Sequence, residues 1–364
     1  MRVLIVATQI LLPDTHGGST HTTEVVACLR KLGPVCCLAQ QGSSGADIAG
    51  IGSPARHAPV IRTLMSALNL PAALNTAREF KPDVVYERGS SYGLGAMIAM
   101  RLKLPLITMV LDEQVSRLSL HLANTLVATH PGLVPAKYRD KVVQVSWGAN
   151  STLFHPDCPA SKLPDGMGGK APLLVYVGSF KKWHGLDLLL QAMSQPSLCN
   201  ACALLVGDGP LRRGLQHRAK EMGIAGRVHF TGAVPYASVP GFVAASDVCI
   251  APFDPHSHRP SGEGFVLDPL KIFEYLAMEK PTVTIKSENI EALFEDHVHL
   301  RLYHPGHLFG LVEAISSLLT EPGKGRTMAG AGRKKVLASH TWEKHADHLY
   351  RLFAEAADNR HAGR

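Results

Sequence analysis

Two adjacent lysines, Lys181 and Lys182, lie in the run VGSFKKWHGLD at residues 177–187. An apolar segment precedes this run and an amphipathic segment follows it, so the pattern predicts a strand, a turn and the start of a helix. Ammonium groups beside a helix N-terminus suit a diphosphate, because the cations and the first backbone N–H groups both favour negative charge. A solvated basic loop is the alternative for the same composition.

A glycine pair, Gly17-Gly18, is a second possible anion site. The pair lies between the apolar segment 3–8 and the amphipathic segment 20–32. Glycines at such a turn let backbone N–H groups approach an anion at the start of a helix. A structural turn is the alternative. The pair matches neither the GxGxxG pattern nor a Walker motif with its lysine, which disfavours dehydrogenases and P-loop enzymes.

Two acidic residues are further candidates. Glu274 lies inside the amphipathic segment 269–278. An acid beside such an apolar face needs a partner or a ligand hydroxyl, with ordinary exposure as the alternative. Asp208 lies in the run VGDGP at residues 206–210, again between an apolar and an amphipathic segment, and it fits a turn or cap residue.

Apolar strands alternate with amphipathic helices along the chain, and these elements must position the candidate residues. Strands that are apolar throughout are typical of a parallel sheet covered on both faces. A stretch rich in Pro, Gly, Asp and Lys at residues 154–171 separates two such sets and indicates a linker. We therefore predict an α/β protein with two doubly wound domains, with the ligand at the carboxyl ends of the strands. The predicted strands cover residues 3–8, 35–39, 82–86, 105–110, 173–177, 203–206, 228–230, 248–251 and 282–285.

Length and composition narrow the class of protein. The chain has 364 residues, which favours two domains, and its 46% hydrophobic and 18% charged residues exclude a disordered chain and a coiled coil. The net charge of +7 suits an anionic ligand, a nucleotide or an acidic lipid surface. The basic residues are scattered without interleaved aromatics, so nucleic acid is not an expected partner.

The sequence predicts a cytoplasmic protein. It has no run of about 20 apolar residues that would form a transmembrane helix. Its seven cysteines are odd in number and spread along the chain, which fits reduced thiols. The segment 60–74, with Arg62, Leu64, Met65 and Leu68, could contact the inner face of a membrane that carries a lipid-linked acceptor. A core-facing helix is the alternative for this segment.

Several ordered runs of the sequence resemble the retaining glycosyltransferases of family four, which have the GT-B fold of two Rossmann-like domains. The resemblance is strongest in LLVYVGSFKKWHGLDLLLQA at residues 173–192, in the run from LLVGDGP to CIAPF at 204–253, and in DPLKIFEYLAMEKPTV at 268–283. VSWGANSTLFHP at 145–156 is similar to the segment that links the two domains. TWEKHADHLYRLF at 341–353 is similar to the terminal helix that packs back onto the first domain.

The resemblance implies that two domains face a central cleft and bind different substrates. Residues 1–155, together with the C-terminal helix at 341–364, would form an N-terminal Rossmann-like domain that binds the acceptor. Residues 170–340 would form a C-terminal Rossmann-like domain that binds the donor. Such enzymes move a sugar from a nucleotide diphosphate donor to an acceptor and keep the anomeric configuration.

The resemblance also implies roles for particular residues. Glu274 would hold the ribose hydroxyls of the nucleotide, and the loop before its helix would present backbone amides to the donor. By position, Gly17 and Gly18 would lie against the diphosphate or the transferred sugar. Catalysis needs cations at the departing diphosphate, and Lys181 and Lys182 are the best local ones. The donor-binding residues that we expect are Gly17, Gly18, Gly178, Ser179, Lys181, His184, Gly207, Glu263, Phe265, Val266, Leu267 and Leu270.

The sequence departs from the family pattern in the donor domain. Ser179 and His184 stand where many members have an arginine and a lysine, and Lys182 is near enough to compensate. Val266 stands seven residues before Glu274, where the family has its first glutamate. Glu263 is therefore only a provisional equivalent of that acid.

The first domain departs from the pattern as well. No histidine follows the strand 105–110, and Asp112 and Glu113 occupy that place. Either acid could contact the acceptor or the sugar, with a helix cap as the alternative. His16 and His21, near the glycine pair, are further possible sugar ligands, with surface placement as the alternative.

The sequence thus favours a retaining, hexosyltransferase-type glycosyltransferase with catalytic roles for Lys182, Glu274 and Asp112. It has no DxD triplet to hold a metal, and we expect neither a metal nor a cofactor. The donor would be a nucleotide diphosphate sugar, with a UDP-sugar slightly ahead of a GDP-sugar. The acceptor would be a glycan, a lipid-linked sugar or a small molecule. The alternatives are a catalytically silent nucleotide-sugar-binding scaffold or partner subunit, and a nucleotide-sugar epimerase, which the order of the motifs disfavours.

Overall fold

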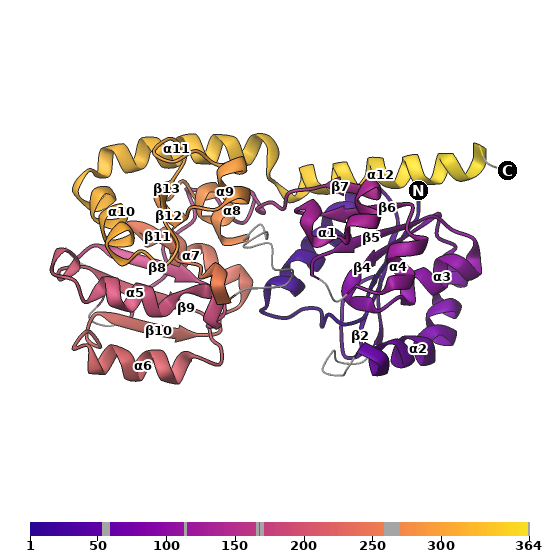
Figure 1. The fold of residues 1–364 in the computed structure, drawn as a ribbon, viewed down its shortest axis with the longest axis horizontal. Helices are drawn as coiled ribbons and strands as arrows, with labels where there is room; N and C mark the ends of the chain where they lie inside the picture. The colour runs from indigo at the N-terminus through magenta and orange to yellow at the C-terminus, as the bar shows by residue number, and fades with distance from the viewer. Residues whose placement is uncertain (53–58, 113–114, 165–166, 168–170, 258–269, 363–364) are drawn as a thin grey trace. The chain divides into compact units, whose positions relative to one another are not determined.

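The computed structural model describes residues 1–52, 59–112, 115–164, 167, 171–257 and 270–362. The chain divides into two compact units (Figure 1). Of the described residues, unit 1 contains 1–146 and 342–362, and unit 2 contains 147–257 and 270–341. Each unit has its own parallel sheet and its own helices, as a doubly wound α/β domain requires.

The sheet of unit 1 has seven strands in the order β3-β2-β1-β4-β5-β6-β7, and every pair is parallel. β1, β4 and β5 are buried along their whole length, as expected for strands covered on both faces. The strands are β1 (Val3–Ala7), β2 (Val35–Gln40), β3 (Ile48–Gly52), β4 (Val84–Arg88), β5 (Leu106–Val110), β6 (Thr125–Ala128) and β7 (Val142–Gln144).

The helices of unit 1 include the C-terminal helix of the chain. They are α1 (Gly17–Leu32), α2 (Pro59–Phe80), α3 (Leu94–Leu102), α4 (Arg117–Leu122) and α12 (Trp342–Ala362). α12 packs against α1 and β4, and its first residue, Trp342, is buried there (Figure 1). The expected return of the terminal helix to the N-terminal part of the chain is therefore confirmed.

The sheet of unit 2 has six strands in the order β10-β9-β8-β11-β12-β13, again all parallel. The strands are β8 (Leu173–Val177), β9 (Cys202–Val206), β10 (Val228–Gly232), β11 (Val248–Ala251), β12 (Thr282–Ile285) and β13 (Arg301–Tyr303). The helices are α5 (Leu186–Met193), α6 (Arg212–Glu221), α7 (Val239–Ala244), α8 (Leu270–Ala277), α9 (Glu288–Leu293), α10 (Leu308–Thr320) and α11 (Pro322–Ser339).

The strand order reverses once in each sheet. In unit 1 the reversal lies between β1 and β4, and in unit 2 it lies between β8 and β11. Ligands of open α/β sheets bind outside the carboxyl ends of the strands at such a switch point. The loop that carries Gly17 and Gly18 follows β1, and the loop that carries Lys181 and Lys182 follows β8. The topology therefore places both predicted anion sites where a doubly wound domain binds ligands.

Four strands were missed by the sequence analysis: β3, β6, β7 and β13. β7 and β13 have three residues each, and β3 contains two glycines, so none of these gives a clear apolar signal. The segment 60–74 lies within one helix, α2, which continues through Pro71 to Phe80.

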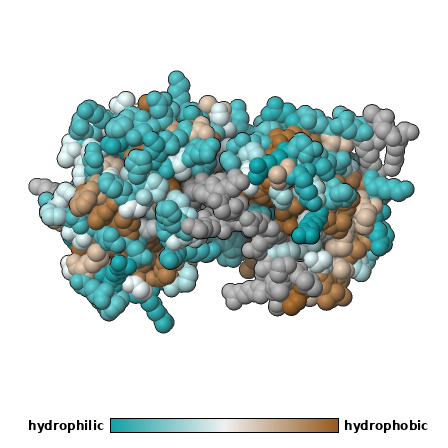
Figure 2. Space-filling model, in the orientation of Figure 1, coloured by the Kyte–Doolittle hydropathy of each residue, from teal (hydrophilic) through white to brown (hydrophobic). Residues whose placement is uncertain are grey.

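α2 exposes an apolar face. Ile61, Leu64 and Leu68 are spaced to share one side of the helix, and they are 45%, 59% and 66% exposed. Figure 2 shows apolar surface in the region of unit 1 where α2 lies. Met65 is half-buried and Ser66 is buried, so another side of the helix faces the interior.

Two glycines at the carboxyl edge of unit 2 allow the loop after β9 to pack closely against the backbone of the loop after β8. Gly207 follows β9 with φ of +136°, and a Cβ atom there would lie 2.1 Å from the carbonyl oxygen of Gly178. Gly178 has φ of +141°, and its N–H donates to the carbonyl oxygen of Val206 at 2.9 Å. Only glycine at position 207 permits this approach, which sets the path of the loop after β8.

We expect Gly207→Ala to lower the free energy of unfolding by about 2–5 kcal/mol, because it adds a left-handed backbone strain to a steric overlap. The measurement is urea unfolding. Gly214→Ala is the control, since Gly214 lies in α6 with open space around its Cβ position. That variant should gain up to about 1 kcal/mol from helix propensity. An unchanged urea midpoint for Gly207→Ala would contradict this account of the loop.

Candidate functional site

The loop after β8 holds several of the predicted donor ligands. Gly178 and Ser179 are half-buried, whereas the side chains of Lys181 and Lys182 are exposed. Residues 182–184 form a short 3-10 turn, and Gly185, with φ of +66°, leads into α5. The loop therefore presents two cations to solution next to the N-terminus of a helix, which is an arrangement suited to an anion.

His184 lies inside this loop. Its Nδ1 atom hydrogen-bonds to the carbonyl oxygen of Ser179 and lies 3.3 Å from the Ser179 hydroxyl oxygen. Its ring is 5% exposed and contacts the ring of Trp183, with centroids 3.8 Å apart. Since a carbonyl oxygen only accepts, the Nδ1 atom carries the proton in this bond. The imidazole thus holds the two ends of the loop together.

Glu274 occupies a buried position on α8. Its side chain is 5% exposed, and one carboxyl oxygen accepts a hydrogen bond from the Tyr236 hydroxyl at 2.8 Å. The Tyr236 ring packs in turn against Phe154, with centroids 5.5 Å apart. A carboxylate can accept several hydroxyl hydrogens at once, which is the chemistry that adjacent ribose hydroxyls need.

Lys271 lies on the same helix, three residues before Glu274, and is not among the residues predicted from the sequence. Its side chain is 8% exposed, and its Nζ atom lies 3.3 Å from the Tyr176 hydroxyl oxygen. The Nζ atom also lies 4.5 Å and 4.7 Å from the ring centroids of Tyr176 and Phe253. A Cβ atom at Gly178 would be only 2.9 Å from this Nζ atom, so the ammonium group lies against the loop after β8.

Burial changes the protonation of Lys271. It lowers the pKa of the side chain to about 7, and the charge of Glu274 acts more weakly in the opposite direction. The ammonium group is therefore only partly protonated at neutral pH. A diphosphate bound at the adjacent loop would favour the charged form and draw a proton onto Lys271.

Asp208 makes the contacts of a turn residue. One carboxyl oxygen accepts the N–H of Gly209 at 2.7 Å, and the other pairs with Arg212 at 2.8 Å. The backbone hydrogen bond from Gly209 is the main cause of a lowered pKa for Asp208. Gly207, beside it, donates its own N–H to the carbonyl oxygen of Gly232 at 3.1 Å.

In unit 1, the glycine pair forms the start of α1. His16 caps the helix, and its Nδ1 atom accepts the N–H of Ser19 at 3.1 Å. Gly17 is exposed and Gly18 is half-buried, so the helix N-terminus is open to solution. Asp112, which follows β5, is half-buried.

His21 is an interior residue. Its side chain is 2% exposed, and its Nδ1 atom lies 3.0 Å from the Nη1 atom of Arg88. Burial is the main cause that lowers the pKa of His21 well below its usual value, so the ring is neutral at pH 7. Surface placement, the alternative considered above, is correct for His16 and wrong for His21.

Five of the predicted residues lie outside the described part of the chain. They are Glu113, Glu263, Phe265, Val266 and Leu267. Leu270, the first residue of α8, is half-buried.

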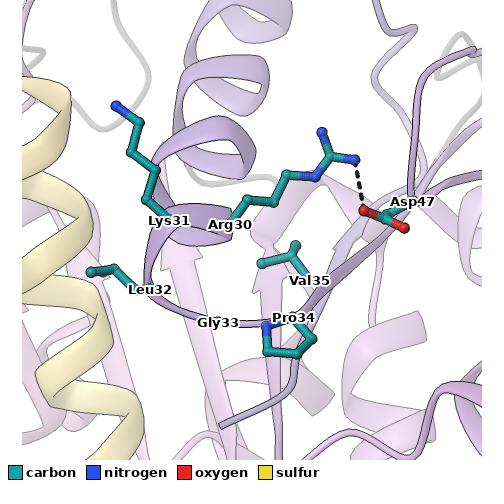
Figure 3. A pocket seen from close by; sticks show the side chains of 7 residues that line it. All are labelled: Arg30, Lys31, Leu32, Gly33, Pro34, Val35 and Asp47. Carbon is teal, nitrogen blue, oxygen red and sulfur yellow. Dashed lines mark hydrogen bonds and ion pairs between the residues drawn. The ribbon is translucent and has the colours of Figure 1, made fainter.

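A shallow pocket of about 550 Å³ lies elsewhere in unit 1 (Figure 3). Arg30 and Asp47 pair across it at 2.8 Å. Its other lining residues are Lys31, Leu32, Gly33, Pro34 and Val35, from the end of α1 and the start of β2. The pocket therefore lies at the amino end of the sheet, away from the glycine pair at the carboxyl end.

Residues 171–321 match the family model described as "Glycosyl transferases group 1". This part of the chain is a group 1 glycosyltransferase domain. The domain begins just before β8 and ends after α10, so it contains the loop with Lys181 and Lys182, the Gly207 turn and α8. The resemblance to glycosyltransferases that the sequence motifs indicated is confirmed.

Curated relatives carry glycosyltransferase names. The lipopolysaccharide core biosynthesis glycosyltransferase LpsD of Rhizobium meliloti is 27% identical over 277 residues, which are 73% of this chain and 73% of LpsD. A GDP-mannose-dependent alpha-(1-6)-phosphatidylinositol monomannoside mannosyltransferase of Mycolicibacterium smegmatis is 25% identical over 59% of this chain and 56% of that protein. The alignment with this second relative therefore covers little more than half of its length.

Solved structures share the fold over nearly the whole chain. Sucrose-phosphate synthase from Thermosynechococcus elongatus superposes with a TM-score of 0.77 at 17% identity, covering 97% of this chain and 98% of that one. HepE from Anabaena, solved in complex with UDP, gives a TM-score of 0.72 at 16% identity, covering 98% and 100%. The expected GT-B-type α/β fold is confirmed.

Two properties of the described residues bear on membranes and metals. Among the helices that the structure describes, none is both long and apolar enough to cross a bilayer. The same part of the chain contains no group of three or more His, Cys, Asp and Glu residues that could hold a metal ion. Metal independence stays a prediction.

We expect a nucleoside diphosphate to bind at pH 8 with uptake of up to about one proton, because its charge raises the pKa of Lys271. Calorimetric titration in two buffers of different ionisation heat measures that uptake. Lys271→Met should abolish the uptake and weaken binding roughly 10- to 100-fold, as for a lost charge-assisted hydrogen bond.

Lys220→Met is the control for this experiment, since Lys220 is exposed at the end of α6. That variant should keep both the proton uptake and the affinity. Equal proton uptake by the wild type and by Lys271→Met would exclude Lys271 as the group that responds to the ligand.

Proposed function

We propose that the protein is a retaining glycosyltransferase that moves a sugar from a nucleotide diphosphate donor to a glycan, a lipid-linked sugar or a small molecule. The observation that carries the proposal is α8, which presents the buried carboxyl of Glu274 and the buried ammonium of Lys271 three residues apart. Together with the exposed Lys182, these groups match the ribose and the diphosphate of one nucleotide. Unit 2 would bind the donor and unit 1 the acceptor.

The reaction breaks the bond between the anomeric carbon and the diphosphate oxygen, and the acceptor oxygen forms the new bond on the same face of the sugar. The acceptor proton passes to the departing phosphate. Negative charge grows on the diphosphate as its bond to the anomeric carbon breaks. Lys271 and the first N–H groups of α5, which are held in place before the reaction, would stabilise it together with the exposed Lys182.

The donor is expected to be a UDP-sugar ahead of a GDP-sugar, bound without a metal. HepE, which shares the fold, was solved with UDP-glucose as well as with UDP. The mannosyltransferase of Mycolicibacterium smegmatis is GDP-mannose-dependent by name. Both nucleotides therefore belong in the first binding experiment.

A lipid-linked acceptor is the form that the surface of unit 1 favours. By their names, LpsD acts in lipopolysaccharide core synthesis and the mycobacterial relative acts on a phosphatidylinositol mannoside. The apolar face of α2 would lie on the lipid, and Arg101 and Lys103, exposed at the end of the neighbouring α3, would favour anionic headgroups. The protein would then work at the cytoplasmic face of a membrane.

We expect UDP or GDP, added without magnesium, to raise the melting temperature by several degrees, since a ligand at about 100 times its Kd adds roughly 2.7 kcal/mol. Glu274→Ala should abolish the shift. Glu291→Ala, which removes an exposed acid of α9, is the control and should keep it. A shift that survives Glu274→Ala would refute the assigned donor site.

The same preparation separates an enzyme from a silent scaffold. Incubation with the matching nucleotide sugar should release nucleoside diphosphate slowly, through hydrolysis, in the wild type and more slowly in Lys271→Met. Nucleotide binding would favour the scaffold if the sugar donor releases no nucleoside diphosphate, either in water alone or with a panel of glycolipid acceptors.

The proposed contact between the apolar face of α2 and a membrane can be tested by substitution. Leu64→Gln combined with Leu68→Gln should lower sedimentation with vesicles containing anionic phospholipid by about 10-fold or more, because each leucine loses about 1 kcal/mol or more of transfer free energy. Phe309→Gln is the matched control, since Phe309 is 68% exposed on α10 of unit 2. Equal sedimentation of the double variant and the wild type would exclude α2 as the lipid-binding face.

A further inference from the structure

Tyr236 is a residue of unit 2 whose hydroxyl the proposed reaction does not use. It lies in the loop that follows β10, at the carboxyl edge where the loops after β8 and β9 also emerge. Its hydroxyl donates a hydrogen bond to the Oε1 atom of Glu274 at 2.8 Å. The two residues are 38 positions apart in the chain and belong to different elements, so the tertiary structure brings them together.

Several contacts fix the hydroxyl of Tyr236 in place. Pro235 precedes it and a short 3-10 turn begins with it, so the backbone that leads into the residue has little freedom. The Tyr236 ring packs against Phe154, with centroids 5.5 Å apart, and Phe154 is fully buried. The N–H of Phe154 donates in turn to the carbonyl oxygen of Asn150 at 2.8 Å. The hydroxyl is therefore positioned before any ligand arrives.

The hydrogen bond from Tyr236 controls one rotation of the Glu274 side chain. The torsion between the last methylene carbon and the carboxyl carbon is broad, so a carboxyl without a fixed donor samples many orientations. The Glu274 side chain is only 5% exposed, and water has little access to it. A donor fixed at the Oε1 atom sets the plane of the carboxyl, and with it the position of the Oε2 atom.

A carboxylate held in this way keeps acceptor capacity for a sugar. Its two oxygens offer about four lone-pair sites, and the Tyr236 hydroxyl uses one of them. The other sites of Glu274 can accept a pair of adjacent hydroxyls, one at each oxygen. Both bonds form together only when the carboxyl plane matches the two hydroxyls, because hydrogen bonds weaken steeply away from their preferred direction.

We propose that Tyr236 is a positioning residue that makes the donor site selective for ribonucleotides over 2′-deoxyribonucleotides. The proposal deepens the proposed function and rests on it, since it takes Glu274 as the group that binds the ribose. With the carboxyl plane fixed, a ribose donates both hydroxyls, whereas a 2′-deoxyribose leaves one carboxyl oxygen without a donor. A buried acceptor left in that state costs free energy, which is how a polar site rejects an analogue that lacks a hydroxyl.

Calorimetric titration of Tyr236→Phe tests the proposal with paired nucleotides. The pairs are UDP with 2′-deoxy-UDP and GDP with 2′-deoxy-GDP, and the pair used is the one whose ribonucleotide stabilises the wild type. The wild type is expected to prefer the ribonucleotide by roughly 10- to 100-fold, as for one lost hydrogen bond to a charged group.

Tyr236→Phe keeps the ring that packs against Phe154 and removes only the hydroxyl. Its preference for the ribonucleotide should fall to about 5-fold or less, because a carboxyl that rotates freely must be ordered before it can accept both hydroxyls. The ribonucleotide should account for most of this change. The 2′-deoxyribonucleotide needs only one bond to the carboxyl, which forms in more orientations.

The ratio of the two dissociation constants separates positioning from stabilisation of the fold. If the hydroxyl only stabilises the fold, Tyr236→Phe lowers the melting temperature and leaves that ratio as in the wild type. This result would overturn the proposal. Tighter binding of the ribonucleotide by Tyr236→Phe would also overturn it, since the hydroxyl would then compete with the ribose for the Glu274 carboxyl.

Two further variants keep the test decisive. Ser238→Ala is the control and should keep both affinities, since Ser238 is exposed on the same turn and its side chain makes no capping hydrogen bond. Phe154→Leu leaves the Tyr236 hydroxyl and the Glu274 carboxyl in place but removes the ring that supports Tyr236. It should lower the preference for the ribonucleotide even if Tyr236→Phe folds poorly. An unchanged preference in Phe154→Leu would count against the proposal.

The outcome is separable from that of the proposed function. A wild type that binds none of these nucleoside diphosphates contradicts the donor site of unit 2 and the role of Tyr236 together. A wild type that binds a ribonucleotide and its 2′-deoxy form equally well keeps a nucleotide site, and it overturns only the selectivity proposed for Tyr236.

Discussion

Parallel pairing of strands is the constraint on which the rest of this structure depends. Because β1, β4 and β5 run in one direction, the loops that follow them emerge at one edge of the sheet of unit 1. The same holds for β8, β9 and β11 in unit 2. Residues far apart in the chain, such as Gly18 and Arg88 or Gly178 and Lys271, are neighbours for this reason alone.

Among the described residues, each unit has a buried cation at that edge, beside a glycine. In unit 1 it is Arg88 next to Gly18, and in unit 2 it is Lys271 next to Gly178. Burial lowers the pKa of both side chains, to about 10 for Arg88 and to about 7 for Lys271. The two groups therefore differ chemically, since Arg88 stays charged whereas Lys271 can gain a proton when an anion binds.

Rigidity of the loop after β8 is what makes these charges useful. The carbonyl oxygen of Gly178 leaves no room for a side chain at Gly207, and His184 ties the end of the loop to Ser179. The hydroxyl of Tyr236 orients the carboxyl of Glu274, which lies on α8, through a hydrogen bond. Groups that are positioned before the ligand arrives stabilise developing charge without a cost in reorganisation.

The sequence by itself determined the fold class and the glycosyltransferase family, because apolar strand runs, helix starts and ordered motifs are local properties of the chain. It also singled out Glu274 from its place in an amphipathic helix. Only the tertiary structure decided that Lys271 and Arg88, among 37 lysines and arginines, are buried, and that His21 is an interior residue. Burial and counter-charge depend on neighbours that the sheet brings together from distant segments, and no local pattern records them.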